Sequence, residues 1–266
     1  MLFPALVWAQ ITITPTIVFM HDGDPAGRIT ITNSSDVPQE VNISLSFGYP
    51  DSDEAGNLLM NYEDEEAAAR FGLDDVMRVF PRRFELAPGE NQILRMQVQQ
   101  AGMRAREDGL HWTRMNITSN ERTRAVDEGG ADRIGARISY RIQQNIGIFY
   151  RKGEVRTGLE LLQLSDRRDA ETGELHLIPR LQRTGNSPFM GTMFASLRDA
   201  SGAVVRESER TFSVYFTQTR PITLDTTNLP PGRYTARLRL EPTRTDLNPR
   251  DQIPGEPLEI DLEVAW

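Results

Sequence analysis

The chain contains no cysteine among its 266 residues, so it forms no disulfide and has neither a thiol nucleophile nor a thiolate zinc site. Histidine is almost as scarce, since His21, His111 and His176 stand far apart in different contexts. His111 lies beside Trp112 in an apolar stretch, where a structural role is expected. Neither a phosphate-binding glycine loop nor a G-x-S-x-G elbow occurs. We predict that the protein is not an enzyme and uses no cofactor and no metal.

An excess of positive charge and a long apolar run are also missing. The formal charge of −8 and the pI of about 5.1 argue against a nucleic-acid or anionic-membrane partner, because both bind basic surfaces. Beyond the N-terminus no stretch approaches the ~20 apolar residues of a membrane span, which argues against membrane insertion.

The first nine residues, MLFPALVWA, resemble the second half of a secretory signal that ends in a small-residue cleavage pattern. We predict that residues 1–9 are the remnant of a signal peptide. An exported protein without disulfides suits the bacterial periplasm better than an animal's extracellular space. The expected location is therefore periplasmic.

The rest of the chain consists mostly of short segments in which apolar residues alternate with polar ones, a pattern typical of strands. Each half offers roughly seven such segments, and Pro231-Gly232 before Tyr234 is typical of the tyrosine corner of immunoglobulin-like sandwiches. We predict an all-β protein of two tandem immunoglobulin-like β-sandwich domains, residues 10–152 and 153–266, with a short linker at 151–156.

One segment of the first half differs from the rest. Nine of residues 51–75 are acidic, and residues 61–70 have the alanine and glutamate content of a short helix that Gly72 would end. Pro50 is expected to stop the preceding strand. We interpret residues 51–75 as a surface insertion.

The longest alternating stretch is RISYRIQQNIGIFYR, residues 137–151, in which only Gln144 interrupts the apolar face. At about 3.3 Å per residue it would run roughly 50 Å, more than one sheet usually pairs. Part of its edge is therefore expected to be left for another chain. The alternative is an ordinary core strand with a short extension.

Several motifs together resemble the first domain of the PapD-like periplasmic pilus-assembly (fimbrial) chaperones. The resemblance covers about residues 10–153, and the second half fits in length and strand pattern. The motifs are ITITPTIVF, GRITITNSSDVPQEVNISL, FPRRFELAPGENQILRMQV, EDGLHWTRMNI and the strand ending IGIFYR.

The resemblance implies a function. In that family two immunoglobulin-like domains form a boomerang, and the last strand of the first domain completes a pilus subunit by donor-strand complementation. The expected partner is thus a pilus or other surface-structure subunit protein. The resemblance implies an interdomain salt-bridge network at Arg95 and Asp108. It implies a client-binding strand at Ile138, Tyr140, Ile142, Ile146 and Ile148.

The sequence departs from the family at the cationic pair that captures the subunit's terminal carboxylate. Thr16 and Gly147 occupy those positions, and neither carries a positive charge. We predict that the anchor is rerouted to Arg151 and Lys152, the alternative being that both face solvent. The long loop at residues 119–136 also lacks the cysteine pair of the family's long-loop branch.

A second function class stays open. The chain could be a structural or adhesive tandem β-sandwich of the cell envelope whose own edges are all satisfied and which has no chaperone activity. The sequence names no client, and it leaves open whether the protein is a monomer or caps itself as a dimer through the same strand.

Overall fold

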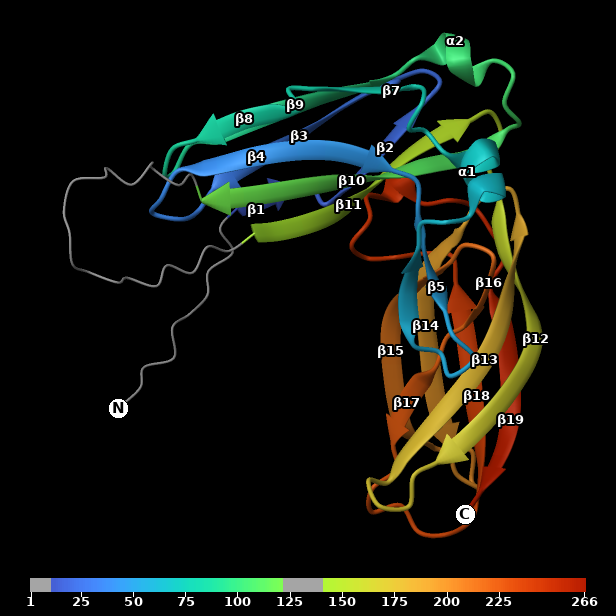
Figure 1. The fold of residues 1–266 in the computed structure, drawn as a ribbon. Coiled ribbons are helices and arrows are strands. Elements are labelled where there is room, and N and C mark those ends of the chain that lie inside the picture. The colour runs from blue at the N-terminus through green and yellow to red at the C-terminus, as the bar shows by residue number, and fades with distance from the viewer. Residues whose placement is uncertain (1–10, 122–140) are drawn as a thin grey trace, which may run out of the picture. The chain divides into compact units, whose positions relative to one another are not determined.

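The computed structural model describes residues 11–121 and 141–266, which fall into two compact units (Figure 1). The described part of the first unit comprises residues 11–47, 65–106, 111–121 and 141–151. The second comprises residues 48–64, 107–110 and 152–266. The main break falls between Arg151 and Lys152, whereas the sequence analysis places the boundary between residues 152 and 153. The two short segments in the second unit were not foreseen.

The first unit is a sandwich of two sheets. One sheet has the strand order β1 (Ile11–Thr14), β3 (Ala26–Asn33), β9 (Asn91–Val98) and β7 (Met77–Phe80). The other has the order β2 (Ile17–His21), β11 (Arg141–Lys152), β10 (Gly109–Glu121), β4 (Gln39–Ser46) and β8 (Arg83–Leu86).

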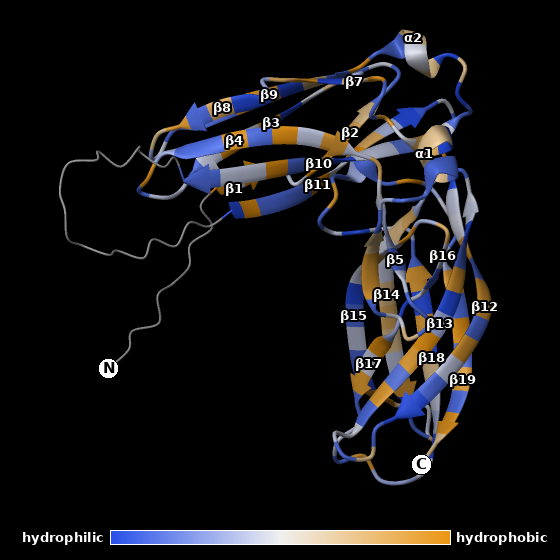
Figure 2. Ribbon diagram, viewed as in Figure 1, coloured by the Kyte–Doolittle hydropathy of each residue, from blue (hydrophilic) through white to orange (hydrophobic). Residues whose placement is uncertain are grey.

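Alternation along these strands builds the first core, and Figure 2 shows it as bands of apolar and polar residues. Ile29, Ile31 and Leu94 face inward from one sheet and are buried, while Ile117 and Ile148 meet them from the other. Each such side chain stabilises the fold by about 1.5 to 3 kcal/mol relative to exposure. Register is therefore strongly specified, because a slip of one residue would turn these side chains outward.

Two short helices complete the first unit, α1 (Glu65–Phe71) and α2 (Gln100–Met103). The helix predicted at 61–70 is present but begins later, with Glu65 and Glu66 in its first turn, where acidic side chains favour the helix dipole. The ring of Phe71 stacks on Trp112 at 5.1 Å. No helix in the described residues is long and apolar enough to cross a membrane.

The second unit is also a two-sheet sandwich, so the predicted fold class, all-β with two immunoglobulin-like sandwiches, is confirmed. The hydroxyl of Tyr234 donates to the Pro230 carbonyl at 2.7 Å, which is the hydrogen bond expected of a tyrosine corner. One sheet contains β12 (Thr157–Arg168), β13 (Glu174–Gly185) and β16 (Thr217–Thr219), with β17 (Ile222–Asp225) also paired to β13. The other has the order β15 (Val204–Val214), β14 (Phe189–Arg198), β18 (Arg233–Glu241) and β19 (Leu258–Ala265).

The acidic segment contains a hairpin that the sequence analysis missed. Its strands are β5 (Tyr49–Ser52) and β6 (Leu58–Asn61). The prediction that Pro50 stops the preceding strand is wrong. Strand β4 already ends at Ser46, and Pro50 lies within β5 opposite Met60. A proline is tolerated there because the ribbon has only two strands. The hairpin belongs to the second unit, so residues 51–64 are not a plain surface insertion in the first.

Candidate functional site

Strand β11 is paired along only part of its length on the side that faces β2. Its residues Gly147–Arg151 lie parallel to Ile17–His21 of β2, and β10 lies on its other side. Because β2 begins at Ile17, no strand among the described residues pairs with Arg141–Ile146 on the β2 side. We call these six residues the binding edge. Backbone N–H and C=O groups on such an edge can pair with a strand of another chain.

The inward side chains of β11 divide into two groups. Ile146 and Ile148 are 4% and 0% exposed and belong to the unit's own core, so these two predicted client-binding residues are not available to a partner. Ile142 is half-buried. The predicted Ile138 and Tyr140 lie outside the described residues. Gln144, the interruption in the apolar pattern, donates from Nε2 to the Ile11 carbonyl at 3.0 Å.

A ladder of amide side chains fixes the outer face of the binding edge. Asn145 Nδ2 and Gln143 Nε2 donate to Asn116 Oδ1 of β10 at 2.6 and 3.4 Å. Asn116 Nδ2 in turn donates to Ser46 Oγ of β4 at 2.8 Å. Three neighbouring strands are thus tied together, so the binding edge is held in an extended conformation before any partner arrives.

The opposite end of β11 is fixed by Tyr150. Its side chain is fully buried, and its hydroxyl donates to Asp22 Oδ1 at 2.9 Å. Burial, with a smaller contribution from the bonded and negatively charged Asp22, raises the pKa of Tyr150 to about 12. The buried side chain at this end of β11 is therefore a neutral phenol whose hydroxyl is hydrogen-bonded.

The structure explains why glycine stands at 147. A Cβ there would lie 2.8 Å from Cε2 of Phe149, closer than side chains tolerate, so a lysine does not fit without displacing that ring. Nη1 of Arg114 lies 3.7 Å from the same Cβ position. Thr16 is exposed between β1 and β2. Arg114 thus brings a positive charge to the place where Gly147 carries none.

Sequence reasoning missed Arg114, although a signal existed. Arg114 and Asn116 alternate on one face of β10, and Asn116 bonds the side chains that share a face of β11 with Gly147. Arg114 lies close to Gly147 only because β10 and β11 are neighbours in the sheet, and the alternation alone does not show this.

The predicted anchors have other contacts. The guanidinium of Arg151 lies 5.3 Å from the ring centroid of Phe19, which stacks on Phe149 at 4.9 Å. In the second unit, Lys152 Nζ forms an ion pair with Asp108 Oδ1 at 2.8 Å. Much of the charge of Lys152 is therefore already neutralised within the protein.

The predicted interdomain pair is found on separate units. Arg95 is exposed on β9 and lies opposite Arg28 and Phe80 of the neighbouring strands. Asp108 takes part in the ion pair with Lys152. A salt-bridge network that joins Arg95 to Asp108 stays a prediction.

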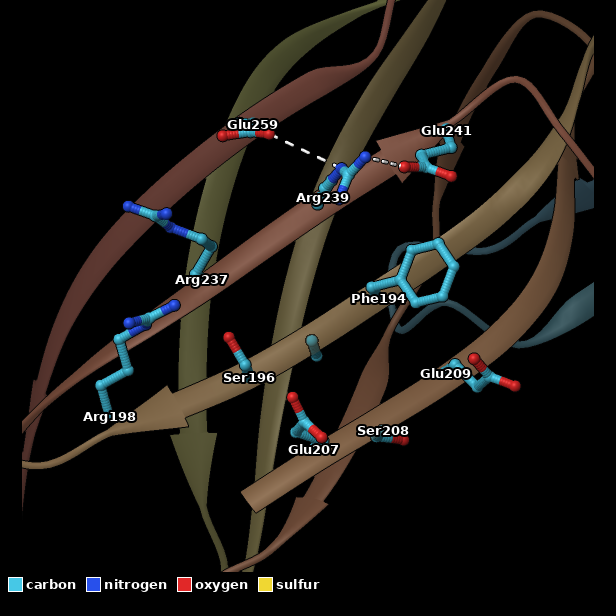
Figure 3. Close-up of a pocket in the computed structure, with 11 residues that line it drawn as sticks. Phe194, Ser196, Arg198, Glu207, Ser208, Glu209, Arg237, Arg239, Glu241 and Glu259 are labelled. Atoms are coloured by element: carbon cyan, nitrogen blue, oxygen red, sulfur yellow. Dashed lines mark ion pairs between the residues drawn. The ribbon is translucent and has the colours of Figure 1, made fainter. Parts of the chain in front are cut away.

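A pocket of about 790 Å³ on the outer face of the second unit offers no comparable chemistry (Figure 3). Both arginines of β18 in its lining form ion pairs: Arg239 with Glu241 and, at 3.6 Å, with Glu259, and Arg237 with Asp261 at 2.7 Å. Phe194 lies among them. Such a ladder is typical of a solvated sheet face.

The sequence matches no protein-family model and no curated protein. Several solved structures that align with it are chaperones, some of them in complex with a pilin or a tip adhesion subunit. They include the YadV chaperone (11% identity, 96% of this chain and 100% of the other, TM-score 0.43). They also include the CsuC–CsuE chaperone–tip adhesion subunit complex of Acinetobacter baumannii (13%, 94% and 98%, TM-score 0.45). A third is the SafA pilin–SafB chaperone complex of Salmonella enterica (14%, 95% and 96%, TM-score 0.43).

At these identities and TM-scores the alignments assign no family, residue role, partner or activity to this chain. The resemblance to the PapD-like chaperones rests on the sequence motifs, and the structure adds the two β-sandwiches.

Proposed function

We propose that the protein is a periplasmic chaperone that binds a pilus or other surface-structure subunit by strand addition along the binding edge. The observation that carries the proposal is the parallel pairing of β11 with β2, which stops at Gly147 and leaves Arg141–Ile146 without a described partner on that side. A subunit that lacks a strand could pair with this edge through main-chain hydrogen bonds.

Side chains on the inner face supply the apolar part of the contact. Ile142 is half-buried, and burying its remaining surface in a client would add a fraction of the ~1.5 to 3 kcal/mol of full burial. Ile138 and Tyr140 continue the alternation in sequence and remain predicted contacts. Ile146 and Ile148 support the strand from within the core instead.

For the client's terminal carboxylate we propose Arg114 as the anchor. Its guanidinium lies beside the Gly147 position, with Nη1 3.7 Å from where a Cβ would stand. A planar guanidinium can bind a carboxylate through two parallel hydrogen bonds. Arg151 remains a second candidate because its guanidinium lies over Phe19, on the strand that pairs with this part of β11.

The test is co-expression with candidate subunits followed by affinity capture from the periplasmic fraction. Ile142→Asp should abolish capture with little change in the thermal unfolding midpoint, because the charge would enter the client's groove unpaired. Ile93→Asp is the matched control, since Ile93 is an exposed isoleucine (44%) on β9, in the other sheet of the first unit, and it should leave capture intact. Capture that survives Ile142→Asp would contradict the proposed edge.

The anchor is tested in the same assay. Arg114→Ala should weaken client affinity by about 3 to 5 kcal/mol if the carboxylate is buried, since its charge would lose its partner. A loss of affinity in Arg151→Ala but not in Arg114→Ala would move the anchor to Arg151. Unchanged affinity in both variants would mean that edge pairing alone carries recognition.

The cellular location rests on the N-terminal sequence. Fusion of the full chain to a reporter that is active only after export should give signal in the periplasmic fraction, and deletion of residues 1–9 should abolish it. Among the residues described, no three His, Cys, Asp or Glu side chains gather as a metal site would require.

A further inference from the structure

We propose that strand β6 of the hairpin is a second docking edge, one that accepts an extended segment of another protein in which apolar and basic side chains alternate. The hairpin consists of β5, the turn and β6 and lies within the segment 48–64 of the second unit. It belongs to the second unit, whereas the binding edge of β11 belongs to the first, and neither proposal depends on the other.

The inner strand of the hairpin is held firmly by the second unit. The ring of Tyr49 is buried, stacks on Tyr215 at 5.9 Å and meets Phe216 edge-on at 4.8 Å. Gln218 Nε2 donates to the Pro50 carbonyl, and the Thr219 N–H donates to Ser52 Oγ at 2.8 Å. Because Gln218 and Thr219 belong to β16, β5 covers the edge of that sheet.

The outer strand carries an apolar surface that this anchoring does not use. Leu58, Leu59 and Met60 are 54%, 47% and 39% exposed, although they follow one another in a strand. Within the described chain β6 pairs only with β5, so its far edge also leaves backbone groups open. An exposed edge with adjacent large apolar side chains is an aggregation risk that proteins normally avoid, unless a partner covers it.

Charge indicates what kind of partner would fit. Residues 48–64 contain five carboxylates and neither lysine nor arginine. Four of them, Asp51, Asp53, Glu54 and Glu63, form no ion pair with any described residue. Asp53 is instead bound by Asn57, at 2.8 Å through both the backbone N–H and the side-chain amide, which keeps its carboxylate beside the turn.

An apolar edge rimmed by unpaired carboxylates favours a strand that carries basic side chains. A second copy of this hairpin would bring like charges together, in a chain whose net charge is already −8. The expected partner is therefore another protein with a strand-forming segment of apolar and arginine or lysine residues, bound by β-augmentation.

The test uses a fluorescein-labelled peptide of about ten residues that alternates valine and arginine, with fluorescence anisotropy on the full-length protein. The double variant Leu58→Asn, Met60→Asn should weaken binding by about tenfold or more, since it removes apolar contact. Leu162→Asn is the matched control, because Leu162 is a similarly exposed leucine (45%) of the second unit, and it should leave binding unchanged. Equal affinity of both variants would overturn the proposal.

A second pair of variants tests whether the peptide is attracted by the carboxylates of the hairpin or by the negative charge of the whole protein. Asp53→Asn with Glu54→Gln should weaken the peptide several-fold, whereas Glu160→Gln with Glu171→Gln removes as much charge elsewhere on the unit and should not. A peptide that alternates valine and glutamate should not bind. If sedimentation velocity instead shows a dimer of the unliganded protein that the Leu58→Asn, Met60→Asn variant abolishes, the edge serves self-association and the basic partner is wrong.

Discussion

Gly147 shows how one missing side chain shapes the candidate site. A methyl group there would lie 2.8 Å from the ring of Phe149, and that ring is held by its stack with Phe19. We predict that Gly147→Ala destabilises the first unit by about 1 to 3 kcal/mol, the usual range for overpacking. Urea unfolding followed by tryptophan fluorescence measures the change. Gly232→Ala is the control, because its Cβ would meet nothing closer than 3.6 Å, and its midpoint should stay the same.

Tyr150 links the stability of the first unit to alkaline pH. The unfolded phenol loses its proton near pH 10, whereas burial raises the pKa in the folded protein to about 12. Between these values the folded state holds a proton that the unfolded state has released, so the free energy of unfolding falls as pH rises. Tyr150→Phe should be less stable near pH 7 by about 1 kcal/mol, through loss of the bond to Asp22.

Above pH 10 the difference should shrink. The variant no longer carries the phenol, so its stability should fall less steeply between pH 10 and 12 than that of the wild type. Urea midpoints at both ends of this window check the sign. A parallel decline in the two proteins would mean that Tyr150 titrates normally in the folded state.

Arg220 is a buried charged residue that lowers the stability of the second unit. Its residue is 5% exposed, its Nε has no hydrogen-bond partner in the structure, and burial with the nearby Arg210 lowers its pKa to about 10. A lowered pKa of a base means that the charged form is disfavoured in the folded state at pH 7, and stability from this group rises only above pH 10. Arg220→Met should therefore raise the free energy of unfolding at pH 7 by about 1 kcal/mol or more.

Differential scanning calorimetry at pH 7 measures this effect. Arg233→Met, at an exposed arginine, is the control and should change the free energy of unfolding by less than about 0.5 kcal/mol. A lower midpoint for Arg220→Met would show that the guanidinium has a stabilising partner.

Among the elements, strands with a buried face could be predicted from the sequence and the hairpin could not. Ile29 and Ile31 in β3 or Leu238 and Leu240 in β18 alternate because one sheet face packs on the core, and period two records that directly. In β6 the residues Leu58–Met60 are all exposed, so no alternation exists to be found.

The candidate site, too, could be predicted only in part from the sequence. The length of β11 and its apolar face followed from alternation, but the point at which it enters the core did not. That point depends on where β2 begins, at Ile17, and on which side chains the opposite sheet covers. Ile142 and Ile148 look alike in the sequence, and only tertiary packing leaves the first half-buried and the second fully buried. Arg114 was hidden for the same reason, since its position depends on strand pairing.

At the scale of the whole molecule, the chain does not divide into two consecutive halves. The second unit takes residues 48–64 and 107–110 from the sequence of the first half. Asn186 binds one of these segments, because its Nδ2 donates to the Asp108 carbonyl at 3.1 Å and its carbonyl accepts from the Leu110 N–H at 3.1 Å. The second sandwich is therefore completed by chain that the sequence places in the first.

Because the second unit includes these two segments, we predict that residues 152–266 fold poorly when expressed alone. Without the hairpin the buried Tyr215 and Gln218 become exposed, and the edge of β16 loses its cover. The loss is comparable to removal of a large buried aromatic, about 3 to 5 kcal/mol, which is a large part of the stability of a single domain. Fusion of residues 48–64 to the fragment through a flexible Gly/Ser linker should restore part of it. Heat denaturation followed by circular dichroism compares the two fragments, and equal midpoints would show that the hairpin contributes nothing to the second unit's stability.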